Sequence, residues 1–258
     1  MKQKGFYKNM SKTDQLNKLF KEWKIKQSKE SHESLTKTMN GEYITKDFFE
    51  ADGIICEEAF EKEPKKVLFI SAEANADEYN GKKGITQTDY RDAYLTYFET
   101  AKDDWSGKMR ERLCGMYKYL TKQKDLKINE AAIRFAVMDI NKRGGKSTID
   151  KGKHIVEYTK IYKDLINREI KIIDPDIVVL VGVNLCRLRI VQELGCIEEK
   201  DKNYFDINGK KVPILLSFQT ANVQYQAKRY PPLDDCENKA IGILCAKLKE
   251  ETIKYGLV

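Results

Sequence analysis

The sequence predicts an α/β fold with three layers, in which helices cover both faces of a short, mainly parallel, four-stranded sheet. Four short apolar runs have the length of strands and indicate the sheet: residues 67–71, 133–140, 177–182 and 212–217. None of them alternates strictly between apolar and polar side chains, which is typical of strands that are buried on both faces. Helical patterns separate the four runs, and this alternation favours a parallel sheet.

The helices are predicted from apolar residues spaced by three and four positions. The pattern at residues 14–25 is helical, with Ser11 or Thr13 as its cap. Asn208-Gly209 is typical of a hairpin turn, so we expect one antiparallel strand near residues 204–207, before the fourth run. Further helices are expected at residues 109–120, 155–170 and 185–194, and from about 235 to 255.

Length and charge predict one main domain with a basic segment before it. A chain of 258 residues can form one large domain, or one domain with an appendage. Residues 1–29 contain nine lysines against Asp14 and Glu22, an excess of seven that accounts for the whole net charge of +7. We therefore expect a basic arm, helix and linker over residues 1–45 and an α/β domain over residues 46–258. Such an arm can attract nucleic acid, but a solubilising tail or a solvated helix face explains the lysines equally well.

The composition argues against several classes of protein. No apolar run approaches the roughly 20 residues that a membrane span needs, and no apolar stretch follows the basic N-terminus, so we expect no membrane association, no signal peptide and a cytoplasmic location. The six cysteines include no C-x-x-C pair, so we expect neither a metal site nor a cofactor. Any mechanism that needs a histidine base has only His32 and His154 as candidates.

The predicted topology also indicates where a ligand would bind. In open α/β sheets, ligands bind beyond the carboxyl ends of the parallel strands. Four segments follow the four apolar runs, and they are among the most polar and glycine-rich of the chain: residues 71–84, 139–153, 182–184 and 217–229. We therefore expect the active or binding site at this edge of the sheet.

The first of these segments contains Glu73 and Asn75. A carboxylate just past a buried strand is half desolvated, which raises its pKa and suits it to hold or activate a water molecule. We interpret Glu73 as the catalytic acid or base, with Asn75 beside it as donor and acceptor. The alternative is that Glu73 caps the next helix or pairs with a lysine of the loop.

The second segment is the most distinctive, because paired glycines stand among cations and polar residues. Glycines let backbone N–H groups approach an anion, and the cations add charge, although the Walker pattern G-x-x-x-x-G-K-[ST] is absent. Asp139 and Asn141 could each read the edge of a base, and the alternative is a merely flexible loop. The predicted phosphate-binding residues are Lys142, Arg143, Gly144, Gly145, Lys146 and Ser147.

The fourth segment is dense in amides and aromatic rings. Phe218 or Tyr225 could stack on a base while Gln219 or Asn222 donates and accepts hydrogen bonds. Aromatic residues after a strand are also common as ordinary packing, which is the alternative interpretation of Phe218 and Tyr225.

Three stretches carry a resemblance to a known family. Residues 67–70 are followed by Ala72-Glu73-Ala74-Asn75-Ala76, residues 172–182 read Ile-Ile-Asp-Pro-Asp-Ile-Val-Val-Leu-Val-Gly, and Arg143-Gly144-Gly145 follows the second run. In their order along the chain they resemble the uracil-DNA glycosylase superfamily, particularly its iron–sulfur branch and related bacterial proteins, over about residues 48–250. The resemblance implies a three-layer fold, DNA as partner, and hydrolysis of the N-glycosidic bond of a flipped base.

Departures from the family pattern keep other functions open. No histidine stands near residues 217–220, where the family has its phosphate-gripping histidine motif, and the cluster cysteines are absent. Asp139 in the place of the family's base-reading asparagine would favour an amino-bearing base, because a carboxylate only accepts hydrogen bonds. We expect a DNA glycosylase-like protein that acts on a flipped or modified nucleobase. The alternatives are a catalytically inactive binder of nucleic acid or nucleotides and an enzyme that acts on free nucleosides or nucleotides.

Overall fold

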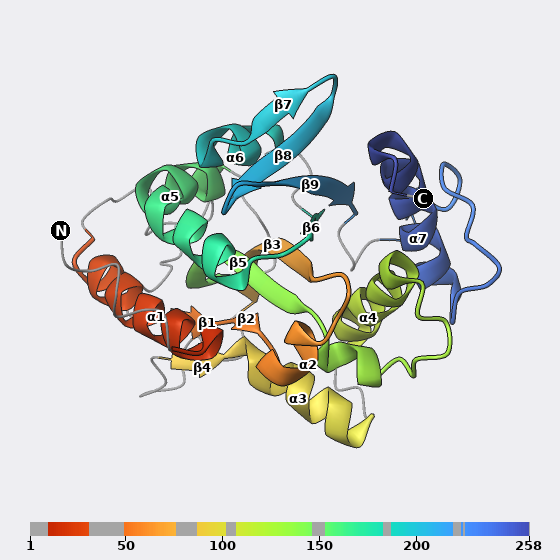
Figure 1. The fold of residues 1–258 in the computed structure, drawn as a ribbon, viewed down its shortest axis with the longest axis horizontal. Helices are drawn as coiled ribbons and strands as arrows, with labels where there is room; N and C mark the ends of the chain where they lie inside the picture. Colours follow the sequence, from red (N-terminus) through yellow and green to blue (C-terminus); the bar gives the residue numbers. More distant parts are fainter. Residues whose placement is uncertain are drawn as a thin grey trace.

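The computed structural model describes residues 10–30, 49–75, 87–101, 107–145, 153–182, 187–218, 223 and 225–257. Its central feature is a seven-stranded mixed sheet with the strand order β2-β5-β3-β6-β9-β8-β7 (Figure 1). Two further strands, β1 (Phe49–Ala51) and β4 (Gln87–Asp89), pair in parallel with each other. The strands of the large sheet are β2 (Gly53–Ile54), β3 (Val67–Asn75), β5 (Ala136–Gly145), β6 (Ile177–Val181), β7 (Ile197–Glu199), β8 (Lys202–Ile207) and β9 (Lys210–Ser217).

The four central strands confirm the α/β class, but the sheet is larger and more mixed than predicted. β5, β3, β6 and β9 are neighbours and run parallel, as expected for the four apolar runs. β2 joins one edge in the antiparallel direction, and β8 and β7 extend the other. Sequence reasoning underestimated these edges because the added strands are short or partly exposed, so they lack the continuous apolar run of a central strand.

The hairpin prediction is confirmed at the turn between β8 and β9. Asn208 and Gly209 both adopt left-handed backbone conformations, with φ values of 52° and 80°. A two-residue turn of this kind matches the twist of the strands that it joins. β8 accordingly pairs antiparallel with β9, in the register Ile207 to Lys210.

Helices form a layer on each face of the sheet (Figure 1). Alternate strand residues separate the two faces: Leu68 and Ile70 of β3 belong to one core cluster, and Val67 and Phe69 belong to the other. The first cluster includes residues of α1 (Lys12–Ser28), α2 (Glu57–Glu61), α5 (Lys153–Ile173) and α6 (Arg187–Leu194). The second includes residues of α3 (Tyr90–Thr100), α4 (Gly107–Thr121), the 3₁₀ helix η3 (Glu130–Ile133) and α7 (Lys239–Tyr255).

The side chains of helix α1 pack into the core of the α/β domain. Its Leu16 and Trp23 are completely buried, and the Trp23 ring stacks on Tyr162 with 5.9 Å between ring centroids. Ser11 caps the helix by accepting a hydrogen bond from the Asp14 N–H. The division at residue 45 followed the charge of this segment, whereas the packing follows its apolar stripe.

Both strands that lead to the predicted site are longer than the sequence suggested. β3 continues to Asn75 and β5 to Gly145, because the two strands keep pairing beyond the apolar runs. Residues that we assigned to loops therefore stand on strands. Among the helices of the described residues, none combines the length and apolar character that crossing a bilayer requires.

Candidate functional site

The ends of β3 and β5 bring the first and second predicted segments to the same edge of the sheet. The two strands are parallel neighbours, and their register pairs Ser71 with Asp139 and Glu73 with Asn141. The register shifts between Glu73 and Ala74. The carboxyl ends of β6 and β9 lie on the same edge, because both strands run parallel to β3 and to each other. The segments predicted to act together thus start side by side.

Part of the predicted site lies outside what the structure describes. For Glu73, Asn75, Gly144 and Gly145 the backbone is described as strand, and anything beyond the backbone is not. The predicted residues that lie wholly outside the described residues are Lys146, Ser147, Gln219 and Asn222.

Asp139 is buried at the sheet edge and is held by two neighbours. Its side chain is 3% exposed, and its carboxylate accepts a short hydrogen bond from the Ser71 hydroxyl. Its backbone N–H donates to Asp52 Oδ2 at 2.7 Å. Asn141, two residues further along β5, is also buried, and its side-chain oxygen accepts a hydrogen bond of 3.1 Å from the Arg143 N–H.

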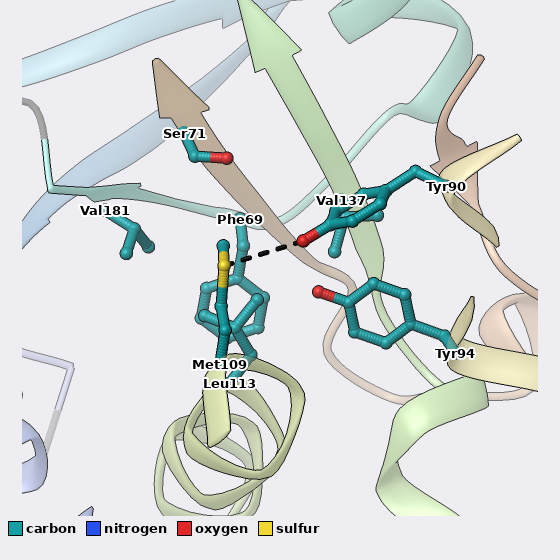
Figure 2. Close-up of a pocket in the computed structure, with 8 residues that line it drawn as sticks. All are labelled: Phe69, Ser71, Tyr90, Tyr94, Met109, Leu113, Val137 and Val181. Carbon is teal, nitrogen blue, oxygen red and sulfur yellow. Dashed lines mark hydrogen bonds between the residues drawn. The ribbon is translucent and has the colours of Figure 1, made fainter. Parts of the chain in front are cut away.

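A small pocket opens beside Ser71, under the first turns of α3 and α4 (Figure 2). The space between its lining side chains does not admit a water molecule, so the pocket is tightly packed in this structure. Figure 2 shows the Tyr90 and Tyr94 hydroxyls directed toward Met109, and the Tyr90 hydroxyl donates to Met109 Sδ at 3.5 Å. The lining residues are Phe69, Ser71, Tyr90, Tyr94, Met109, Leu113, Val137 and Val181.

Charged groups surround the Tyr90 end of this pocket. Burial raises the pKa of Tyr90 well above its usual range, the negative charges of Asp139 and Glu50 raise it further, and Arg110 opposes them. Glu50 and Arg110 are themselves buried. These three charged side chains act on the Tyr90 hydroxyl, and none of them is among the residues that line the pocket.

Lys142 occupies a closed cluster on the other face of the sheet. Its side chain is completely buried, and its Nζ lies 2.5 and 2.6 Å from the two carboxylate oxygens of Asp52 and 3.0 Å from Glu169. The Nζ also lies 5.5 Å from the centroid of the Phe20 ring and 5.3 Å from that of Trp23. Burial is the largest single effect and lowers the pKa of Lys142, but Asp52 and Glu169, through charge and hydrogen bonds together, hold that pKa above its ordinary value.

Glu169 must carry a proton for this cluster to be neutral, because two carboxyl groups face one ammonium. Burial raises the pKa of Glu169 well above its usual range, and the charge of Asp52 raises it further, while Lys142 opposes both. We therefore take Lys142 and Asp52 as the ion pair and Glu169 as a neutral acid. This neutral arrangement suits a site that water does not reach.

Arg143 is also paired inside the domain. Its guanidinium forms an ion pair with Glu30 at the end of α1, and it lies 5.3 Å from the ring centroid of Tyr158. Glu30 in turn accepts a hydrogen bond of 2.5 Å from the Tyr162 hydroxyl. The interpretation of Lys142 and Arg143 as phosphate-binding cations therefore changes, since both charges are already neutralised by acidic side chains of the same chain.

The fourth predicted segment is described only in part. Phe218 follows β9 directly, is half-buried, and contacts Tyr230 at 4.9 Å between ring centroids, which fits the packing interpretation of that ring. Tyr225, in contrast, is 77% exposed.

Sequence reasoning did not single out the residues that line the pocket. Ser71 ended an apolar run and began the first segment of the predicted site, but no role was assigned to it. Tyr90 and Tyr94 stand in a helix that no strand-end rule selects. Their spacing of four places both rings on one face of α3, which is a signal that the sequence does contain. Among the described residues, no group of three or more histidine, cysteine or carboxylate side chains is placed to hold a metal ion.

Comparisons of the sequence with known proteins do not identify a family, so the class of protein is defined here by its fold and site geometry. No protein-family model matches the sequence, and no curated protein matches it. The fold and the site define a three-layer α/β protein with a mixed sheet and a small aromatic pocket at the carboxyl ends of its parallel strands.

Proposed function

We propose that this chain is a DNA glycosylase-like protein, a hydrolase of N-glycosyl bonds that acts on a flipped or modified nucleobase. One observation carries the proposal: β3 and β5 are parallel neighbours, and their register pairs Glu73 with Asn141. A residue that activates water and a residue that reads a base must both reach the same nucleotide. The neighbouring ends of β3 and β5 meet that requirement, which supports the proposal.

In the proposed reaction, Glu73 orients a water molecule for attack on the sugar carbon of the glycosidic bond, with Asn75 beside it. Asp139 or Asn141 reads the base edge, and a ring of the segment after β9 stacks on the base. In this proposal the backbone of Gly144 and Gly145 and the residues that follow bind the phosphates. Lys142 and Arg143 do not, because each has an acidic partner inside the domain.

The test is base release from a panel of oligonucleotides that carry damaged and unusual bases. We expect abasic sites, detected as strand breaks after alkali, and a loss of about 10²–10⁴-fold in the rate for Glu73→Gln. Glu58→Gln is the matched control, because Glu58 is an exposed carboxylate that pairs with Lys62 at the surface. The proposal fails if the wild-type protein releases no base from any member of the panel.

A catalytically inactive binder is the second candidate, and the internal pairing of Lys142 and Arg143 favours it. Its affinity would then come from surface lysines. Because α1 belongs to the core, a truncation that tests this must stop before Ser11. Removing residues 1–9, with their three lysines, should reduce the salt slope of DNA binding by up to about 3. DNA binding that responds neither to salt nor to this truncation contradicts the candidate.

A further inference from the structure

The second half of α1 carries a strongly positive outer face. Residues 18–29 contain five lysines and a single acid, Glu22. Four exposed residues recur on one side of the helix and its C-cap at the 3.6-residue repeat, and we call them the α1 stripe: Lys18, Lys21, Ile25 and Lys29. The opposite, apolar side of the helix is buried in the core. The stripe is therefore presented to solvent by a helix that packing holds in place.

The acid beside the stripe does not neutralise it. Both carboxylate oxygens of Glu22 accept hydrogen bonds from Arg168 of α5, at 2.6 and 2.8 Å. The charge of Lys18 also acts on this carboxylate, so the cations outnumber it. Within the described residues, no acidic side chain pairs with Lys21 or Lys29. Several exposed lysines of other segments do have an acidic partner: Lys62, Lys124, Lys127 and Lys160.

The stripe leads to the carboxyl edge of the sheet. α1 lies beside α5 and runs in the opposite direction (Figure 1). Lys12, at the start of α1, donates a hydrogen bond to the last residue of α5, and Lys26, near its end, donates to Ile161 in the first half of α5. Just beyond α1, Glu30 forms its ion pair with Arg143. Because Arg143 directly precedes the two glycines that end β5, α1 ends next to the strand end where the proposed function places the phosphates.

We propose that the α1 stripe binds the phosphate backbone of duplex DNA and continues the contacts assigned to the end of β5. The choice of DNA as partner rests on the proposed function. From Lys18 to Lys29 the helix rises about 16 Å, a length over which a DNA duplex carries about ten negative charges. Lysine suits this partner because its ammonium contacts phosphates without reading a base. A membrane surface fits less well, because the apolar side of α1 is buried in the core and Ile25 is the one apolar residue of the stripe.

The experiment is binding of an undamaged, fluorescently labelled DNA duplex to the full chain, measured by anisotropy over about 0.05–0.2 M salt. The test variant combines Lys18→Gln, Lys21→Gln and Lys29→Gln. Each lysine that contacts a phosphate contributes about 0.9 to the slope of log K against log salt. We therefore expect the slope to fall by about 2–3 and the affinity at about 0.1 M salt to fall at least about tenfold.

The matched control removes the same charge elsewhere on the surface. It combines Lys62→Gln, Lys124→Gln and Lys127→Gln, three exposed lysines that have acidic partners, and it should change the slope by less than about 1. Equal losses of slope in both variants overturn the inference, as does an unchanged slope in the stripe variant or a wild type that binds no DNA. Binding to anionic phospholipid vesicles that the stripe variant loses, with DNA binding unchanged, also overturns it.

Two readouts keep the result interpretable. Both variants change exposed side chains, so their melting temperatures should stay close to that of the wild type; if the stripe variant melts early, Lys21→Gln with Lys29→Gln replaces it, with an expected loss of slope of about 2. Undamaged DNA involves no base release. A protein that releases no base, but whose stripe variant loses the slope, supports this inference and contradicts the proposed function. Base release by the wild type, with DNA binding unchanged in the stripe variant, contradicts this inference alone.

Discussion

Replacing Lys142 by methionine should destabilise the domain severely. The ammonium group lies 2.5 and 2.6 Å from the oxygens of Asp52 and is completely buried. Methionine fills a similar volume but leaves the Asp52 carboxylate without its counter-charge. Removing one partner of a buried ion pair typically costs about 3–5 kcal/mol. A domain has only about 5–15 kcal/mol of stability, so the loss amounts to a large part of it.

Urea unfolding followed by far-ultraviolet circular dichroism measures this loss. The matched control is Lys62→Met, which breaks an exposed pair with Glu58 and should leave the free energy of unfolding nearly unchanged. The double variant Lys142→Met with Asp52→Asn should recover part of the loss, because it removes the unpaired charge. The reasoning is refuted if Lys142→Met costs no more than the control, or if adding Asp52→Asn makes the protein less stable still.

Two further predictions concern the same core. Because the pKa of Glu169 is raised in the folded state, its stabilising contribution is present at low pH and is lost as the pH rises above about 4.5. Glu169→Gln should therefore gain stability relative to the wild type between pH 5 and pH 9, by at most about 1.4 kcal/mol per pH unit, and an equal difference at both pH values in urea unfolding would refute this. Gly115→Ala places a Cβ 2.5 Å from Ile241 Cγ2, so it should cost about 1–3 kcal/mol although alanine favours helices. In a double-mutant cycle with Ile241→Ala, strictly additive losses would contradict that steric explanation.

Pairing between strands decided how long the strands at the site are. The apolar run of β3 ends near Ser71, and beyond it the sequence becomes polar, which predicts a loop. Backbone pairing with β5 continues through Glu73 to Asn75, however. Hydrogen bonds of a ladder depend on the neighbouring strand and not on the local side chains, so local polarity could not reveal them.

The two cations of β5 illustrate why a charged motif does not by itself identify a binding site. Lys142 and Arg143 stand next to paired glycines, a pattern that suits a phosphate. Their partners Asp52, Glu169 and Glu30 come from three segments that are distant in the sequence. Only the folded chain brings these carboxylates close to Lys142 and Arg143, and no local sequence pattern predicts the pairs.

The sequence by itself determined the α/β class, the four parallel strands, the β8–β9 hairpin and the edge of the sheet at which the polar segments start. These features depend on hydrophobic periodicity and turn chemistry, and both are properties of residues that are close together in the sequence. Tertiary structure alone decided the place of α1 in the core and the neutralisation of Lys142 and Arg143. Those depend on contacts between residues far apart in the chain, and burial sets the energy of every charge and hydroxyl involved.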